Sequence, residues 1–245
     1  MSDSMIEQSA ARLFSGNVDK ALLEKFETGT FPDQLWQLAV DSGFDVALAS
    51  EASGGIGETW TAAYPILRGL GYWQVPLPLS ETMIAAMLLS MAGIERPEGP
   101  VTLIEQGIGN GLAIAGSGSA MKISGTAPRV PWARRCGAAL VSIAGSGIAL
   151  VDLRDAKTVS LTERLDVSRV PSDTVSFDGA GVIAFAPNPL PALERPVFTL
   201  GAVARSMMMV GALEWLLEQS APPTRTTKCC PRRPGAWPTC RWSAW

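Results

Sequence analysis

The stretch LRGLGYWQVPLPLSETMIAAMLL, residues 67–89, joins two helical patterns through a short extended segment. Pro76 and Pro78 disfavour helix in the residues that precede them, so the chain around them is expected to be extended. Ser80 suits the N-cap of the following helix, because a serine side chain accepts a hydrogen bond from an early backbone N–H. The stretch therefore predicts two consecutive helices of one helical unit, the second ending near Met91.

The helical spacing continues upstream of this stretch. Leu35, Leu38 and Ala39 recur at helical steps after Pro32, a residue that suits the first turn of a helix. We therefore expect a helical N-terminal domain over residues 1–93.

After Gly93 the pattern changes to short apolar runs separated by turn residues, such as LAIAG, AALVSIAG, IALVDL and TVSFDG. Such runs are typical of strands, and they predict a β-barrel or β-sandwich middle domain over residues 94–190. Helical periodicity returns over residues 193–220 as one apolar stripe: Leu200, Val203, Met207, Val210, Leu213 and Leu217. The expected fold class is therefore α+β, with residues 191–220 as the start of a C-terminal helical bundle.

The composition excludes several classes of function. The 245 residues include no histidine, which rules out histidine bases, Ser-His-Asp triads and most zinc sites. A net charge of -3 provides no basic field for nucleic acid or anionic lipid, so the expected ligand is small. The four cysteines lack CxxC spacing and predict neither a disulfide framework nor a metal site.

The chain is expected to be cytoplasmic, because its first residues are acidic where a signal peptide needs positive charge. The longest apolar stretches are too short to span a bilayer or are interrupted by Arg205 and Glu214, so no transmembrane helix is expected. Residues 221–245 contain five prolines, five basic residues and no acid. Since no apolar period runs through them, we expect a disordered tail unrelated to the rest of the chain.

Several strings together resemble the acyl-CoA dehydrogenase family in their order and spacing. FPDQLWQLAVDSGF at residues 31–44 resembles the family's Pro-x-x-Leu-Trp helix, ASEASGGIGE at 49–58 its Gly-Gly loop, and PLPLSET at 76–82 its Pro-x-Pro-Leu-x-Glu-Thr helix entry. Further similarity lies in residues 122–153, in residues 164–182 and in the helix ARSMMMVGALEWLLEQS at 204–220. The resemblance covers roughly residues 5–220.

The resemblance implies a helical domain, a β-barrel domain and a C-terminal helical bundle that mediates dimer or tetramer formation. In that family FAD lies between the barrel and the bundle. A glutamate removes the α-proton of an acyl-CoA while the β-hydrogen leaves as hydride to the flavin. FAD and an acyl-CoA are therefore the expected cofactor and substrate. The expected partner is another acyl-CoA dehydrogenase chain, in a homo-oligomer or a hetero-oligomer.

The resemblance assigns the flavin contacts to five positions: Leu103, Ile104, Arg129, Val130 and Pro131. The family's Leu-Thr-Glu-Pro string reads Leu-Ile-Glu-Gln from residue 103, so an isoleucine replaces a hydroxyl donor. The family's Trp-x-Ser/Thr element corresponds to residues 129–131. Trp132 either fills the aromatic role after a local slip in register or packs on the barrel edge.

No catalytic residue is assigned in this chain. The family's glutamate base usually comes from a part of the bundle beyond residue 220, and a minority carries it at a position that corresponds to one near Gly201 here. Glu194 lies too early, and Glu214 falls on the surface side of an amphipathic helix. The chain as given is therefore expected to lack the base and to be inactive.

Three interpretations follow. The first is an oxidoreductase of the acyl-CoA dehydrogenase type, whose intact form oxidises an acyl-CoA at Cα and Cβ with FAD. The second is a non-catalytic partner subunit of a heteromeric acyl-CoA dehydrogenase, favoured by Ile104, Arg129 and Pro131.

The third interpretation is a degenerate gene product. Where the family continues with Tyr-Ala-x-x-Arg-x-Gln-Phe-Gly, this chain reads APPTRTTKCC from residue 221. A shift of one base recodes residues 223–228 to begin with Tyr-Ala, which favours a frameshift or a sequencing error. A genuine basic tail is the alternative.

Overall fold

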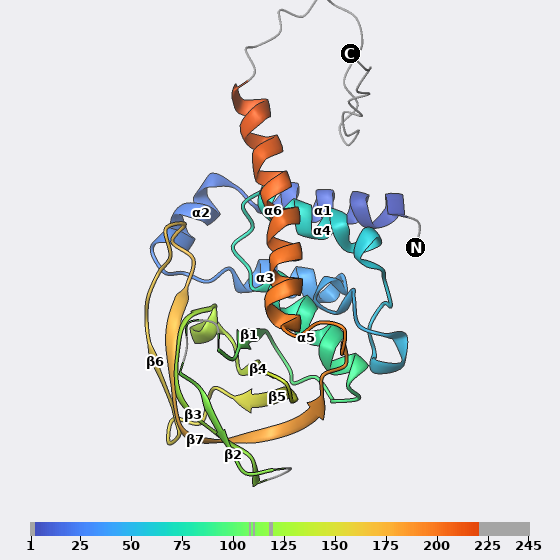
Figure 1. The fold of residues 1–245 in the computed structure, drawn as a ribbon. Coiled ribbons are helices and arrows are strands. Elements are labelled where there is room, and N and C mark those ends of the chain that lie inside the picture. The colour runs from blue at the N-terminus through green and yellow to red at the C-terminus, as the bar shows by residue number, and fades with distance from the viewer. Residues whose placement is uncertain (1–2, 108, 110, 118–119, 221–245) are drawn as a thin grey trace, which may run out of the picture.

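The computed structural model describes residues 3–220, except residues 108, 110, 118 and 119 (Figure 1). The described part contains six α-helices and a seven-stranded sheet, which confirms the predicted α+β class. The expected disordered tail, residues 221–245, lies outside the described residues.

Five helices form the N-terminal layer: α1 Asp3–Asn17, α2 Lys20–Glu27, α3 Asp33–Asp41, α4 Trp60–Tyr72 and α5 Leu79–Met91. Pro65 lies inside α4 without ending it. The predicted N-cap of α5 was wrong, because α5 begins at Leu79 and Ser80 lies inside it. The Ser80 hydroxyl instead donates to the neighbouring Glu81 carboxylate at 2.8 Å.

The strands follow as one sheet that curls into a half-barrel. They are β1 Val101–Glu105, β2 Ala113–Ala115, β3 Lys122–Pro131, β4 Ala138–Ile143, β5 Gly147–Asp152, β6 Val159–Thr162 and β7 Ser172–Pro187. The strand order is β1-β4-β5-β7-β3-β2, with β6 also paired to β7. Only the β1–β4 pair is parallel among the described strands; the other pairs are antiparallel.

The sheet is covered on both faces where β1, β4 and β5 lie side by side. Leu103, Leu140 and Ile148 belong to the core shared with α5, whereas Ile104 and Val141 belong to the core inside the half-barrel. These strands therefore read as continuous apolar runs, as expected for strands buried on both faces.

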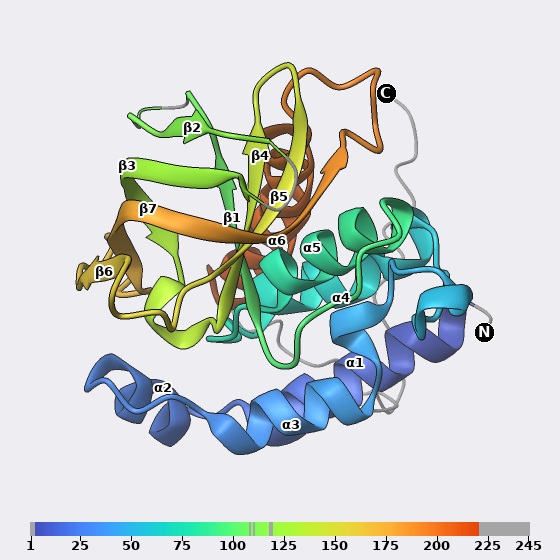
Figure 2. The ribbon, with the colours of Figure 1, turned by 90° about the horizontal axis from the view of Figure 1, so that it is seen from below.

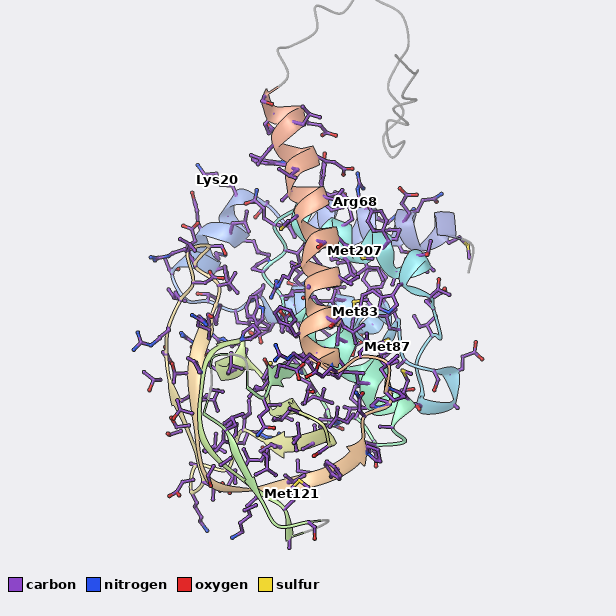
Figure 3. All side chains as sticks on the ribbon, viewed as in Figure 1. Lys20, Arg68, Met83, Met87, Met121 and Met207 are labelled. Atoms are coloured by element: carbon purple, nitrogen blue, oxygen red, sulfur yellow. The ribbon has the colours of Figure 1, made fainter. Side chains whose placement is uncertain are left out.

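The last helix, α6 Pro196–Ser220, crosses the helical layer and packs on α4 (Figures 1 and 2). Two glycines let the backbones approach closely. A Cβ added to Gly71 would lie 1.8 Å from the Met208 carbonyl oxygen, and one added to Gly211 would lie 2.0 Å from the Arg68 carbonyl oxygen. Figure 3 shows Arg68 and Met207 along this contact.

The face that α6 buries matches the predicted stripe only in part, at Leu200 and Met207. The buried side is formed by Val197, Leu200, Ala204 and Gly211, with Met207 and Met208 half-buried. The predicted stripe residues Val203, Val210, Leu213 and Leu217 are exposed instead. Small residues face α4 because its backbone lies too close for large side chains.

Among the described residues, α6 is the one helix long and apolar enough to cross a membrane by length and hydropathy. A single helix of this kind is weak evidence for a span, because core helices of soluble proteins meet the same criteria. Here α6 also forms ion pairs with the helical layer, between Glu214 and Arg68 and between Arg205 and Glu81.

Candidate functional site

A cavity of about 350 Å³ lies between the half-barrel and the first half of α6. All five positions expected to contact the flavin line it: Leu103, Ile104, Arg129, Val130 and Pro131. The structure thus brings together two segments that are more than 20 residues apart in the sequence. We call this space the inner cavity. That its lining residues bind a flavin stays a prediction.

A β-bulge shapes the β3 side of the inner cavity. Ala127 pairs with Val175 and Val130 pairs with Asp173, so two residues of β3 oppose one residue of β7. Arg129, the second of these two, has a left-handed backbone with φ of 57°. A non-glycine residue in this conformation costs about 1 kcal/mol or more and persists only where its surroundings hold it. The bulge therefore turns the chain toward the cavity.

The end of β3 is held in place by its neighbours. The Thr102 hydroxyl on β1 donates to the Pro131 carbonyl at 2.5 Å, and the Trp132 N–H donates to the Pro171 carbonyl at 2.9 Å. Trp132 is 2% exposed and lies 5.7 Å from Phe26 and 6.3 Å from Phe31, centroid to centroid. Trp132 does not line the cavity, so of the two predicted roles the structure supports packing at the barrel edge.

A buried ion pair fixes the turn that follows Trp132. Asp173 on β7 is fully buried, and it accepts hydrogen bonds from the Arg134 guanidinium and from the backbone N–H groups of Arg134 and Arg164. Burial raises the pKa of Asp173, but these hydrogen bonds outweigh it and hold the pKa below its usual value. The carboxylate is therefore ionised and binds two segments that flank the cavity-lining residues.

Two glutamates line the inner cavity, and both carboxylates have partners. Glu81 on α5 forms an ion pair with Arg205 on α6 and accepts the hydrogen bond from Ser80. Glu105, at the end of β1, accepts a hydrogen bond from the Phe198 N–H at 2.9 Å. This N–H is one of the first in α6, where a carboxylate is favoured by the unpaired donors and the helix dipole.

The two acids considered as bases lie elsewhere. Glu194 is exposed in the loop before α6, and Glu214 pairs with Arg68 at the α4–α6 contact. Gly201, near the position where a minority of acyl-CoA dehydrogenases is expected to carry the base, does line the inner cavity. A Cβ added there would meet no heavy atom within 4 Å. The position of Gly201 therefore has room for a ligand but carries no acidic side chain that could act as a base.

A second space of about 630 Å³, the outer cavity, lies between the helical layer and the β6–β7 end of the sheet. Its lining combines residues of α2, α4 and α6 with the loop around Asp166. Arg129, Pro131 and Arg205 line both cavities, so the two spaces meet at these residues. Together they could hold an elongated ligand whose ends lie in different environments.

Sequence reasoning missed the α6 and α5 contributions to the inner cavity. Arg205 was noted only as an interruption of an apolar stretch, and Glu81 only as part of the string PLPLSET. Their ion pair joins residues 124 positions apart, and no local pattern carries that information.

The described residues contain no group of three or more His, Cys, Asp or Glu side chains that could hold a metal ion. Cys136 is a free cysteine, and burial raises its pKa well above the usual value. Its thiol is therefore neutral and packed inside the half-barrel, which argues against nucleophilic chemistry at this residue.

No protein-family profile matches the sequence, and no curated protein matches it either. Solved structures do match the fold. A structure described as the Tcur3481-Tcur3483 steroid ACAD G363A variant superposes with a TM-score of 0.77 and 23% identity, over 89% of this chain and 64% of that chain. The fold of this chain is that of the acyl-CoA dehydrogenases.

Other solved structures agree with this result. The ChsE4-ChsE5 complex from Mycobacterium tuberculosis matches with a TM-score of 0.77 and 19% identity, over 89% of this chain and 65% of that chain. PigA with FAD and proline matches with a TM-score of 0.66 and 15% identity, over 89% of this chain and 67% of that chain. This chain thus spans less than two thirds of the length of the first two.

Proposed function

We propose that this chain is a subunit of an acyl-CoA dehydrogenase-type flavoprotein that acts in the cytoplasm. An acyl-CoA would extend from the outer into the inner cavity, and the flavin of FAD would lie against residues 103–104 and 129–131. The observation that carries the proposal is the convergence of these two segments with α6 on one cavity. The reaction of the intact enzyme would be oxidation of the acyl-CoA at Cα and Cβ.

The lining residues fit such ligands chemically. Leu103, Ile104 and Val130 are buried and apolar, as suits the face of a flavin ring or an acyl chain. Arg129 and Arg205 lie where the two cavities meet. When bound, FAD would supply the hydride acceptor, and the protein's residues would position the two ligands and exclude water.

A cavity-filling variant tests the binding site. Gly201→Leu places a side chain into the inner cavity at a position with open space around Cβ. Its matched control is Gly16→Leu, since Gly16 is also a helical glycine with open space and lines neither cavity. We expect isothermal titration to show butyryl-CoA binding to the wild type and the control, and at least tenfold weaker binding to Gly201→Leu. Equal binding by all three would refute the proposed site.

A specific observation favours the non-catalytic partner subunit as the second candidate. Both glutamates of the inner cavity are engaged, Glu81 by Arg205 and Glu105 by the α6 N-terminus, and Gly201 brings no acid. A base must be free to take the substrate proton. Two of the similar solved structures carry paired names, Tcur3481-Tcur3483 and ChsE4-ChsE5.

Turnover separates the candidate functions. The purified chain alone is expected to leave an artificial electron acceptor oxidised with any acyl-CoA, because both glutamates of the inner cavity are engaged. Coexpression with a related chain that carries a glutamate base is expected to yield a stable complex if the partner-subunit proposal holds. Stoichiometric FAD absorbance and turnover by the chain alone would support the catalytic subunit instead. A chain that binds neither thioester nor partner would fit the degenerate gene product.

A further inference from the structure

Two arginines lie at the boundary between the two cavities. Arg129 belongs to the bulge in β3, and Arg205 belongs to the third turn of α6. With Pro131 they are the residues common to the linings of the inner and outer cavities. A ligand that occupied both cavities would pass these two residues, and we call this place the arginine passage.

The two arginines differ in how their charge is balanced. Arg205 forms an ion pair with Glu81, whose side chain is 5% exposed. Arg129 is exposed, and within the described part of the chain no carboxylate lies within ion-pair distance of its guanidinium. One positive charge of the passage is therefore compensated by the protein, and the other is open to a ligand.

The remaining acidic side chains around the passage accept hydrogen bonds from other groups or lie in the outer cavity. Glu105 accepts the Phe198 N–H, and Asp166 accepts the N–H groups of Ser168 and Val170 within its own turn. Glu27 lines the outer cavity and is exposed to solvent. None of these carboxylates forms an ion pair with Arg129 in the described structure.

The backbone of Arg129 is held in a conformation that this residue type rarely adopts. Its φ is 57°, and it lies in the bulge between Ala127 and Val130. The next residue but one, Pro131, accepts a hydrogen bond from the Thr102 hydroxyl through its carbonyl. Strain of this kind is common at ligand-binding positions. The structure thus holds an arginine without an ion-pair partner among the described residues at the boundary of the two cavities, where a Cβ added to Gly109 would lie 3.3 Å from its guanidinium.

We propose that the arginine passage binds an anionic group, a carboxylate or a phosphate, of the ligand that spans the two cavities. The inference rests on the proposed function and narrows its substrate class, because the anion can belong to the CoA phosphates or to a carboxylate on the acyl group. Arg129 is the specificity-determining residue, and Arg205 shapes the passage while paired with Glu81. A guanidinium binds either anion through two parallel hydrogen bonds.

Isothermal titration of the full chain with three thioesters distinguishes the sources. Butyryl-CoA carries phosphates, succinyl-pantetheine carries only a carboxylate, and butyryl-pantetheine carries neither. We expect Arg129→Gln to weaken binding of at least one anionic thioester about tenfold and to leave butyryl-pantetheine unchanged. Arg129→Lys should restore part of the affinity. The control is Arg154→Gln, an exposed arginine outside both cavities, which should bind all three as the wild type does.

The outcomes separate this inference from the proposed function. A loss confined to butyryl-CoA assigns the anion to the phosphates, and a loss confined to succinyl-pantetheine assigns it to the acyl group. Unchanged binding by Arg129→Gln, or equal weakening of all three thioesters, overturns the inference while the proposed function stands. If no thioester binds the wild type, the proposed function fails, and inorganic pyrophosphate serves as the probe. Pyrophosphate binding that is lost in Arg129→Gln then supports the anion site. If pyrophosphate does not bind, or binds the variant equally well, the inference is overturned.

Discussion

Asp173 and Asp45 are both buried, but their surroundings shift their pKa values in opposite directions. The pKa of Asp173 is lowered, because hydrogen bonds from Arg134 and two backbone N–H groups outweigh burial. The pKa of Asp45 is raised by burial, which the Arg96 guanidinium, 3.0 Å from its carboxylate, offsets only in part. The ionised form is therefore favoured by folding at Asp173 and disfavoured at Asp45.

The Asp173→Asn variant should lower the free energy of unfolding at neutral pH by about 3 kcal/mol, because it leaves the Arg134 guanidinium without its buried partner. The matched variant Asp45→Asn should change it by less than about 1 kcal/mol, since Arg96 is partly exposed and can be hydrated. Urea titration measures both. Equal losses in the two variants would contradict this account.

The same two residues predict a pH dependence. A lowered folded-state pKa means that Asp173 contributes stability above its unfolded-state pKa of about 3.9, and this stability is lost as the pH falls through the folded-state value. The difference between wild type and Asp173→Asn should therefore shrink as the pH falls below about 5. For Asp45 the sign is reversed, so Asp45→Asn should gain stability relative to wild type as the pH rises above about 4. If the free energies of unfolding of the wild type and both variants changed in parallel with pH, neither carboxylate would titrate as described.

The local strings predicted five flavin-contacting positions, and the structure brings all five to one cavity. Their contact with a flavin stays a prediction. Local sequence patterns could not identify the residues of other elements that contact these positions. The Glu81–Arg205 pair and the contact of Glu105 with the α6 N-terminus form only when distant segments fold together. The conformation of Arg129 also depends on the pairing of β3 with β7.

At the scale of elements, α6 shows why hydrophobic periodicity identified a helix but not its buried face. The periodicity predicts a buried stripe of large residues from Leu200 to Leu217, but only its first part, at Leu200 and Met207, packs on the core. The helix also buries Ala204 and Gly211, because α4 approaches to backbone contact. Periodicity reports where apolar residues recur, and it does not report how closely the neighbouring helix packs.

Two glycine substitutions in α6 test this packing. Gly211→Ala should destabilise the chain by about 1 to 3 kcal/mol, because the new methyl group would lie 2.0 Å from the Arg68 carbonyl oxygen and force the helices apart. Gly201→Ala should stabilise it by about 0.5 to 1 kcal/mol, because alanine favours helix and the position has open space. Thermal unfolding of both variants gives the comparison. A harmless Gly211→Ala would show that α4 and α6 are farther apart than described.

At the scale of the whole molecule, the second half of α6 presents an apolar surface to solvent. Met209, Leu213, Leu216 and Leu217 are between 53% and 69% exposed. A contiguous apolar surface normally marks an interface or an aggregation hazard. In the resembled family, a helical bundle and neighbouring subunits are expected to cover this helix.

The purified chain is therefore expected to self-associate and to bind a hydrophobic dye. The variant carrying Leu213→Glu and Leu217→Glu should show less self-association and less dye binding. Its unfolding transition should be unchanged, because these side chains are exposed in the described structure. Light scattering and dye fluorescence provide the readouts. A dilute, stable wild-type monomer without dye binding would mean that this surface is already covered.

The central claim concerns the whole molecule: the space between the half-barrel and α6 is a binding site for a flavin and an acyl-CoA. The most direct test is a crystal structure of the chain with FAD and butyryl-CoA soaked into the crystals. A coexpressed partner is included if the chain needs one for solubility. The account predicts electron density for the flavin against residues 103–104 and 129–131, and density for the thioester beside Gly201 with the CoA portion in the outer cavity. Ligand density at another place, or an inner cavity filled by the chain's own side chains, would contradict it.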